Sequence, residues 1–541
     1  MMVNMQKTNR KTKADEIKAL FDENSQIKNM SYFVLNLQVN IFYIEQIVDR
    51  KLLSASLLLP LSNLRMENQK NASGESQNVK NAKNNTETNK INEILSKITL
   101  PSVEEIQKNE DAFQKILDGA VLVVIDDSMY AYPLFGAEKR GLEEPPTSRV
   151  VKGPREGFVE DIGVNIGLVR KRIRSSNLKI EDLFIGRKTN TKVSLIYLDD
   201  VAKPEILKEV KKRLKEIDID AIIDSYYIES FLEGKKIKFF RRVGNTEKPD
   251  VFSSKILEGR VGVLVDGSPI ALTVPFVLME DLQSPEDYYT IPTFASFARI
   301  MRFIGLVFAI LVPGIFVALQ SFNYRILPIN FLITLLSSIE GLSVPPLIEI
   351  LLVLFLFEII TEASLQMPNS LGMALSIIGA LALGNTAVDA GIISPPSIVI
   401  VAISSVALYI IPNQIAETRM LRLLFTTIGG IIGLYGIVTA FIILTTYLSK
   451  MDSFGVPYLS PLAPSVKHDK KDAFIKGSVQ DMLTRPELIA GKNKTRQVAT
   501  DYEENNTVKS KPQNQTKNTA KESKKSNKNA EKISVMENKE G

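Results

Sequence analysis

The chain has 541 residues, too many for a single compact domain, and a formal net charge of +5 with the excess lysine near the C-terminus. It contains no Cys, which excludes disulfides and thiolate metal sites. Its one His, His468, lies in the C-terminal tail. A catalytic or metal site built on His is therefore excluded from the body of the chain.

The N-terminal part, residues 1–68, is predicted to be helical. From Ile27 to Leu64 apolar residues recur at helical spacing, which favours one or two amphipathic helices in a soluble module. The polar start of the chain predicts no cleavable signal peptide. Residues 69–90 are rich in Asn and Lys and almost lack apolar side chains. Such a segment cannot bury enough surface to fold, so we expect a disordered insertion there.

Residues 91–298 carry the mixed strand and helix signals of an α/β module. A hairpin is predicted where Asp126 and Asp127 follow an apolar run. A second hairpin is predicted at Asp266-Gly267, with a type I′ turn that needs positive φ at both residues. Further elements are a strand at 193–198 and helices at 203–216 and 221–232. No Gly-rich phosphate-binding motif is present, which favours a scaffold or binding module over a catalytic one.

A helix from Pro154 to Arg174 is predicted within this module. Its apolar residues fall on one face, its acidic residues lie near the N-terminus and its basic residues near the C-terminus, which suits the helix dipole. One interpretation is a well-formed amphipathic helix and nothing more. The other is a helix that contacts neighbouring subunits, with these interface candidates: Glu160, Asp161, Arg170 and Arg172.

Residues 299–450 are predicted to form a transmembrane domain. Charge-free apolar runs of about 20 residues or more recur there, each long enough to cross the hydrocarbon core as a helix. Four crossings are expected, at roughly 303–324, 369–388, 393–411 and 423–448. Gly residues between Gly429 and Gly436 suit close helix packing.

The basic residues around these runs predict the orientation. Arg299 and Arg302 precede the first run and lysines follow the last, which places the N-terminal module and the tail in the cytoplasm by the positive-inside rule. Both ends inside require an even number of crossings. Arg419 and Arg422 then fall on the outside, in conflict with the same rule.

The segment 326–366 is predicted to be a broken or re-entrant helical stretch. A Pro345-Pro346 break precedes an apolar run that carries Glu349, Glu358 and Glu362. Carboxylates at membrane depth are costly and usually face a cavity or a protein interior. One interpretation is an amphipathic helix lying at the interface. The other is that these three residues line a polar pathway, where a ring of Glu from several subunits would favour cations.

The C-terminal residues 451–541 are predicted to be a cytoplasmic, largely disordered tail rich in Lys. Its composition is polar, and its lysines could be attracted to anionic lipid. The fold class predicted from the whole chain is an α/β soluble N-terminal region followed by an α-helical multi-pass transmembrane domain.

Several stretches together resemble the GerA family of spore germination proteins, in particular the A subunit of the nutrient germinant receptor. The resemblance covers roughly 95–465 in order. The stretches that carry it are VKGPREGFVEDI, NIGLVRKRIR, IGRKTNTKVSLIYL, DSYYIESFLEG, LEGRVGVLVDGSPIALTVP, SPEDYY, LVPGIFVALQSFN, IIGALALGNTAVDAGIISPPSIVIVA and SFGVPYLSPLAP.

The resemblance implies a multi-pass protein of the spore inner membrane. It implies as partners a transporter-like B subunit that binds the nutrient and a lipoprotein C subunit. It further implies assembly of the A subunit, as a pentamer, into a ligand-gated cation channel, with no enzyme activity, no cofactor and no nucleic-acid partner.

Other functions are also considered. A family paralogue acting in ion or dipicolinate release has the same architecture. A transport-accessory membrane scaffold is a further alternative. A transporter acting alone would require paired broken helices in two repeated halves, which we do not find, and a membrane enzyme would require convergent catalytic groups.

Overall fold

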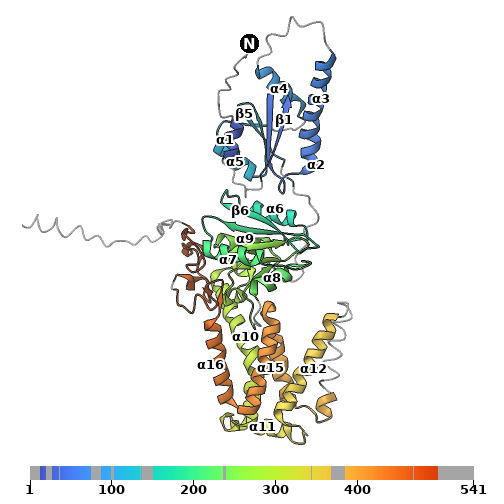
Figure 1. The fold of residues 1–541 in the computed structure, drawn as a ribbon. Helices are drawn as coiled ribbons and strands as arrows, with labels where there is room; N and C mark the ends of the chain where they lie inside the picture. Colours follow the sequence, from blue (N-terminus) through green and yellow to red (C-terminus); the bar gives the residue numbers. More distant parts are fainter. Residues whose placement is uncertain are drawn as a thin grey trace, which may run out of the picture. The chain divides into compact units, whose positions relative to one another are not determined.

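A computed structural model describes most of the chain (Figure 1). The residues that it describes are 13–19, 27–35, 37–74, 87–98, 103–134, 136, 150–234, 239–342, 344–366, 384, 386–466 and 468–497.

The first α/β subdomain is a five-stranded antiparallel sheet with the strand order β1-β2-β4-β5-β3. One face of the sheet packs against α3 and α4, and the other packs against α1 and α5. Each face therefore has its own apolar core. The elements are α1 Lys13–Ala19, β1 Ile27–Val34, β2 Leu37–Ile44, α2 Arg50–Leu53, the π-helical turn Ser54–Leu58, α3 Leu59–Gly74, α4 Glu87–Lys97, β3 Glu104–Ile106, α5 Asn109–Leu117, β4 Val121–Ile125 and β5 Ser128–Tyr132.

The second α/β subdomain repeats this arrangement. Its strand order is β6-β7-β9-β10-β8, which is the order of the first sheet with five added to each strand number. Helices α7 and α8 cover one face and α6 and α9 cover the other. The elements are α6 Ile162–Arg172, β6 Leu178–Ile185, β7 Thr191–Leu198, α7 Pro204–Lys215, α8 Ser225–Glu233, β8 Gly244–Thr246, α9 Pro249–Leu257, β9 Val261–Val265 and β10 Ala271–Val274.

A short sequence repeat marks the duplication. Lys115–Ser128 (KILDGAVLVVIDDS) and Lys255–Ser268 (KILEGRVGVLVDGS) align without a gap and form the same helix, turn and strand. The turn glycines Gly119 and Gly259 both have positive φ, 92° and 102°. Glycine reaches this conformation without steric cost, and it ends α5 and α9 in the same way.

Residues 27–44 are strands, so the prediction of helices there is wrong. They form the β1–β2 hairpin, and Leu35 in the turn has a φ of 52°. The apolar residues that appeared to follow a helical spacing lie in two different strands, on either side of this turn. The two stretches are rich in β-branched and aromatic side chains, which favour strands. The predicted disordered insertion is also shorter than expected, because residues 69–74 belong to α3 and 87–90 to α4; residues 75–86 lie outside the described residues.

Two local predictions in the second subdomain need correction. Helix α6 begins at Ile162 after Asp161, whose side chain accepts hydrogen bonds from the N–H groups of Gly163 and Val164, so residues 154–160 are not helical. An Asp at the N-cap fixes a helix start better than the earlier Pro154 does. The Asp266-Gly267 hairpin is present, but only Gly267 has positive φ, at 84°, so its turn is not type I′.

The apolar part of the chain is a block of helices that run side by side (Figure 1). Helices α10 and α15 approach closely at glycines. A Cβ atom on Gly429 would lie 2.4 Å from the carbonyl oxygen of Gly314. Gly433, with a φ of 76°, separates α15 from α16. The helices are α10 Pro292–Ser321, α11 Ile329–Ile339, α12 Pro346–Gln366, α14 Pro395–Leu408, α15 Ile415–Ile432 and α16 Leu434–Lys450; the 3₁₀ turns are Leu278–Leu282, Pro285–Tyr289, Tyr324–Ile326 and Pro412–Gln414.

The number of crossings is not confirmed. Within the described residues, α10 alone is long and apolar enough to cross a membrane by itself. Helix α14 and the stretch Pro412–Ile432 would make a second crossing as one span, but they are bent by 109° at their break. Helices α11 and α16 are shorter apolar helices. Most of the predicted crossing at 369–388 lies outside the described residues, so four crossings stay a prediction.

The C-terminal segment 451–497 is ordered over its described residues, which contradicts the prediction of a largely disordered tail for this part. Ile489 joins the apolar core on one face of the second sheet and Ala490 joins the core on the other. The N–H of Gly491 donates to the carbonyl of Val201 at 2.6 Å. A few apolar residues, such as Ile489 and Ala490, thus anchor this otherwise polar segment to the second subdomain. Its short elements are β11 Asp452–Ser453, β12 Val456–Pro457 and the 3₁₀ turns Asp469–Lys471 and Val479–Asp481.

Candidate functional site

Glu349, on the first turn of α12, is buried and bound within the chain. Its Oε1 accepts hydrogen bonds from the N–H and the hydroxyl of Ser394, at 2.7 and 2.6 Å. Ser394 is the N-cap of α14, where the helix dipole favours a negative charge. Glu349 therefore holds the start of α14 against α12 and does not face open space.

Glu358 is paired with two arginines of α15. Its carboxylate lies 2.8 Å from Nη2 of Arg422 and 3.2 Å from Nη1 of Arg419. Arg422 is buried and also donates to the hydroxyls of Ser404 and Ser405 on α14. Three helices thus meet at one ionic cluster. The conflict that Arg419 and Arg422 posed for the orientation is reduced only in part, because the single carboxylate of Glu358 offsets one of their two positive charges.

Glu362 is exposed on α12 and accepts a hydrogen bond from the side chain of Gln366 at 3.2 Å. The three predicted pore residues therefore do not act alike in a single chain. Glu349 and Glu358 bind side chains of other helices, whereas Glu362 is exposed and binds Gln366 of its own helix.

The two arginines that precede the apolar helices are also bound within the chain. Arg299 and Arg302 both donate to the carboxylate of Asp287, at 3.0 and 2.8 Å. Arg299 also contacts Asp472 of the C-terminal segment at 2.9 Å. Although burial raises the pKa of Asp287, the hydrogen bonds from both arginines outweigh it and hold that pKa below its usual value. Arg299 is buried and Arg302 is half-buried, and both pair with Asp287, so their charges are partly offset within the chain.

The four predicted interface residues separate into two groups. Glu160 and Asp161 are exposed, and Asp161 caps α6. Arg170 is buried, and burial lowers its pKa to about 10. Arg172 pairs with Glu156 of the same chain at 2.5 Å. The structure thus gives both arginines a place inside the protomer, and it leaves Glu160 as the residue that a neighbouring subunit could reach.

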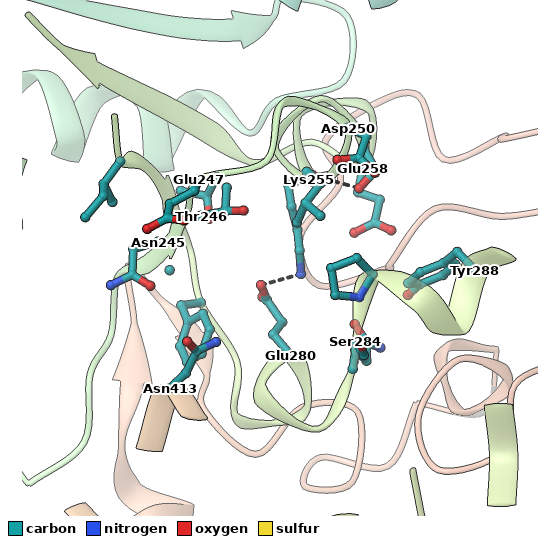
Figure 2. A pocket seen from close by; sticks show the side chains of 18 of the residues that line it. Asn245, Thr246, Glu247, Asp250, Lys255, Glu258, Glu280, Ser284, Tyr288 and Asn413 are labelled. Carbon is teal, nitrogen blue, oxygen red and sulfur yellow. Dashed lines mark hydrogen bonds and ion pairs between the residues drawn. The ribbon is translucent and has the colours of Figure 1, made fainter. Parts of the chain in front are cut away.

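A pocket of about 600 Å³, with both apolar and charged residues in its lining, lies where the second subdomain meets the helix block (Figure 2). Residues of α9, β8, β10 and the two 3₁₀ turns after β10 line it, and Pro412 and Asn413 reach it from the break between α14 and α15. Lys255 of α9 extends across the pocket and donates to Glu280.

The ion pair at the centre of the pocket belongs to a buried network. Glu280 binds Lys255 and also Arg260, which in turn binds Glu258. Burial alone would raise the pKa of Glu280, but Arg260 and Lys255 together keep it lowered. Burial lowers the pKa of Lys255, and Glu280 only partly offsets that effect. Removal of Glu280 would leave Lys255 and Arg260 without the carboxylate that they share.

Sequence reasoning missed this pocket, although one signal was available. Lys255, Glu258 and Arg260 all lie in the second copy of the short repeat. A comparison of the two copies shows that Arg260 replaces the Ala of the first copy, and this difference was the available signal. Glu280 and Asn413 carry no motif and are brought in by the tertiary fold. Within the described residues, no cluster of three or more His, Cys, Asp or Glu is placed to hold a metal ion.

The chain is similar in sequence to known spore germination proteins. The family model described as Bacillus/Clostridium GerA spore germination protein matches residues 15–488. Spore germination protein KA of Bacillus subtilis (strain 168) is 34% identical, covering 84% of this chain and 82% of its own. The protein named uncharacterized membrane protein YfkQ, from the same organism, is 37% identical over 65% of this chain and 69% of its own.

One solved structure is also similar in sequence. It is the crystal structure of the N-terminal domain of the A subunit of the Bacillus megaterium spore germinant receptor GerK3, at 30% identity and a TM-score of 0.34, covering 48% of this chain and 92% of that one. The family match extends beyond the resemblance seen from motifs, into the first α/β subdomain and the C-terminal segment. The chain belongs to the GerA family of spore germination proteins.

Proposed function

We propose that the chain is the A subunit of a spore nutrient germinant receptor and that several copies assemble into a ligand-gated cation channel. The observation that carries this proposal is the family match over 15–488, which spans both α/β subdomains, the helix block and the docked C-terminal segment. The GerK3 structure is named as an A subunit of a germinant receptor, and YfkQ is named as a membrane protein.

The helix block supports a membrane location with both ends on one side. The second subdomain precedes α10, and the C-terminal segment follows α16 and packs on that subdomain through Ile489 and Ala490. The two therefore lie on the same side of any membrane that the block crosses. An even number of crossings follows, which agrees with four, and the cytoplasmic side of the spore inner membrane is the side proposed for both ends.

Within the assembly, α12 is the helix that we propose to line the pathway. Glu362 is its exposed carboxylate, and a ring of this residue from neighbouring copies would favour cations. Glu358 and Glu349 lie on the same helix and would join the pathway only if their partners on α15 and α14 moved away. The proposed partners are a nutrient-binding B subunit and a lipoprotein C subunit, with a pentamer of this chain in membrane lipid.

The experiment is a measurement of membrane current from the chain co-expressed with its B and C partners in a non-sporulating cell. Addition of candidate amino acids should open a cation current. Glu362→Gln should lower the cation-to-anion permeability ratio several-fold while leaving the complex assembled. Glu340→Gln, at an exposed position in the break before α12, is the matched control and should leave selectivity unchanged.

A second candidate function is a transport-accessory scaffold. The observation that favours it is that Glu349 and Glu358 bind partners in their own chain, as residues that join helices do. An assembled complex without any nutrient-dependent current would favour the scaffold. A current whose selectivity ignores Glu362 would keep the channel but remove α12 from its lining.

A further inference from the structure

Part of the C-terminal segment lies against the first turns of α10. The N–H of Lys476 donates to the hydroxyl of Ser296 at 2.9 Å. Further along α10, the rings of Phe303 and Phe474 meet edge to face, with their centroids 5.1 Å apart. The chain from Phe474 to Lys476 therefore runs back along α10, from Phe303 toward Ser296.

This contact reaches the level at which the first crossing is predicted to begin. Phe303 is the first residue of that crossing, and Phe474 packs against it. Ala473 and Phe474 also join an apolar cluster that contains Leu306 of α10 and Ile411, which follows α14. An otherwise polar segment is thus packed among residues of the apolar helices.

The length of α10 places its first part at the surface of any membrane that it crosses. The helix has 30 residues and is therefore about 45 Å long, whereas the hydrocarbon core is about 30 Å thick. Arg325, exposed just beyond the far end of α10, keeps that end at the opposite surface, because a charged side chain avoids the core. About ten residues at the start, 292–301, then extend into the headgroup region.

The exposed face of α10 is apolar from this surface region into the predicted crossing. Apart from Thr293, every exposed residue of α10 between 293 and 308 is apolar, and these residues are Phe294, Phe297, Ile300, Met301, Phe303, Ile304 and Phe308. Phe303 is both exposed and in contact with Phe474, so the next residue, Ile475, borders this apolar surface. The Ile475 side chain is itself 67% exposed.

The C-terminal segment also covers the charged side of α10 at this level. Arg299 is fully buried, and its Nη1 donates to the carbonyls of Asp472 and Ala473, both at 2.9 Å. Charged side chains at membrane depth are normally paired and turned toward protein. The segment thus binds the arginine on its inner side and leaves Ile475 exposed on its outer side.

We propose that Ile475 and the exposed apolar residues at the start of α10 lie in the headgroup–acyl boundary of the membrane. The C-terminal segment then contacts lipid without crossing the membrane, as interfacial elements do. The occupant of this surface is phospholipid hydrocarbon, because the surface continues without a charge into the exposed face of α10 that would cross the membrane. This inference rests on the membrane location in the proposed function, and it adds a lipid contact by a segment predicted to be cytoplasmic.

The absence of native Trp allows this contact to be measured by fluorescence. Ile475→Trp and Phe297→Trp each replace an exposed apolar side chain, so misfolding is not expected. The full-length variants are reconstituted in phosphatidylcholine vesicles whose acyl chains are brominated near the carboxyl end, and Trp is excited where Tyr does not absorb. Emission should fall about twofold relative to unbrominated vesicles, because an interfacial apolar face lies roughly 5–10 Å inside the boundary. Bromination near the methyl end of the acyl chains should quench both variants less.

Two further variants serve as matched controls. Phe308→Trp lies deeper on the same exposed face of α10, so bromine near the methyl end should quench it more strongly than bromine near the carboxyl end. Lys492→Trp is exposed in the same C-terminal segment, next to Gly491, which binds the second subdomain. Neither brominated lipid should quench it.

The outcomes separate this inference from the proposed membrane location. Quenching of Phe308→Trp and Phe297→Trp without quenching of Ile475→Trp would place lipid on α10 alone and would overturn the contact by the C-terminal segment. A blue-shifted but unquenched Ile475→Trp emission would show that protein, such as a second copy, covers this site, and would overturn it too. No quenching of Phe308→Trp would refute the membrane location itself, and the proposed contact with it.

Discussion

The two α/β subdomains share a strand order and a helix–turn–strand repeat, but they place the lysine of that repeat in opposite environments. In the first, Lys115 pairs with Glu104 at the surface, where 40% and 61% of the two side chains are exposed. In the second, Lys255 pairs with Glu280, and only 15% and 6% are exposed. The hydrogen bond to Glu104 raises the pKa of Lys115, whereas burial lowers that of Lys255.

The difference comes from parts that lie outside the repeat. At the position equivalent to Glu104 the second subdomain has Gly244, so Lys255 has no partner on the neighbouring strand. Its partner comes from the 3₁₀ turn that follows β10, and Asn413 of the helix block lies on the pocket wall. The same strand order thus carries two different pairs: the first subdomain has a solvated ion pair, and the second has a buried charge network next to the apolar helices.

The largest expected effect is on the buried pair. Glu280→Gln leaves both Lys255 and Arg260 buried without their shared carboxylate and should cost roughly 3 to 5 kcal/mol of stability. The matched change in the first subdomain, Glu104→Gln, should cost less than about 1 kcal/mol because that pair is exposed. The measurement is thermal unfolding of the full chain in detergent, followed by circular dichroism. Equal shifts in the two variants would show that the two copies do not differ as described.

A packing swap provides the next test. Phe252 on α9 fills the space above Gly262 on β9, where an added Cβ would lie 2.2 Å from the ring. The equivalent pair in the first subdomain is reversed in size, with Ala112 on α5 and Leu122 on β4. Phe252→Ala alone should cost roughly 3 kcal/mol through the cavity that it leaves.

The double variant Phe252→Ala with Gly262→Leu copies the first subdomain and should recover most of that loss. Gly262→Leu alone should be destabilising through overpacking. Additive losses in the double variant, seen in the same unfolding experiment, would mean that the two cores are not interchangeable in this way.

The sequence was most informative where local chemistry decides structure. The hairpins at Asp126 and Asp266 and helix α7 follow from turn residues and periodicity, and the structure confirms them. The pattern misled where an i,i+4 spacing crossed a turn, as between Phe33 and Ile41, and where a polar segment docked through only a few apolar residues, such as Ile489.

The candidate site was harder to predict than the fold. Glu358 was predicted as a possible pore-lining residue, but the sequence did not predict its partner Arg422, which is 64 residues away and can be identified only from the tertiary structure. The pocket has the same limitation, because Lys255, Glu280 and Asn413 come from three separate segments. Their own sequence surroundings do not mark them as neighbours.

A pH effect of intermediate size is expected from Glu229 on α8 of the second subdomain. Burial, with a contribution from nearby Glu233, raises the pKa of Glu229 to about 7. The unfolded chain ionises this group near its ordinary value, so the stability that it contributes is present below about pH 4 and is lost as pH rises toward 7. Glu229→Gln should therefore raise stability at pH 8 by about 2 kcal/mol and have little effect at pH 4. Unfolding midpoints measured at both pH values test this, and a gain that is equal at the two would exclude ionisation as the cause.

The smallest effect on stability, and the one that bears on assembly, is expected at Glu160 before α6. This residue is exposed, whereas Arg172 on the same helix is bound to Glu156 within the chain. Arg172→Gln should lower the unfolding midpoint by the equivalent of about 1 kcal/mol without changing the oligomeric state. Glu160→Lys should leave the midpoint unchanged, but if α6 contacts a neighbouring subunit it should reduce the assembled fraction, measured by light scattering in detergent. An unchanged mass distribution for Glu160→Lys would leave α6 as a helix that serves only its own subdomain, and contacts between subunits would then have to be sought on the helix block.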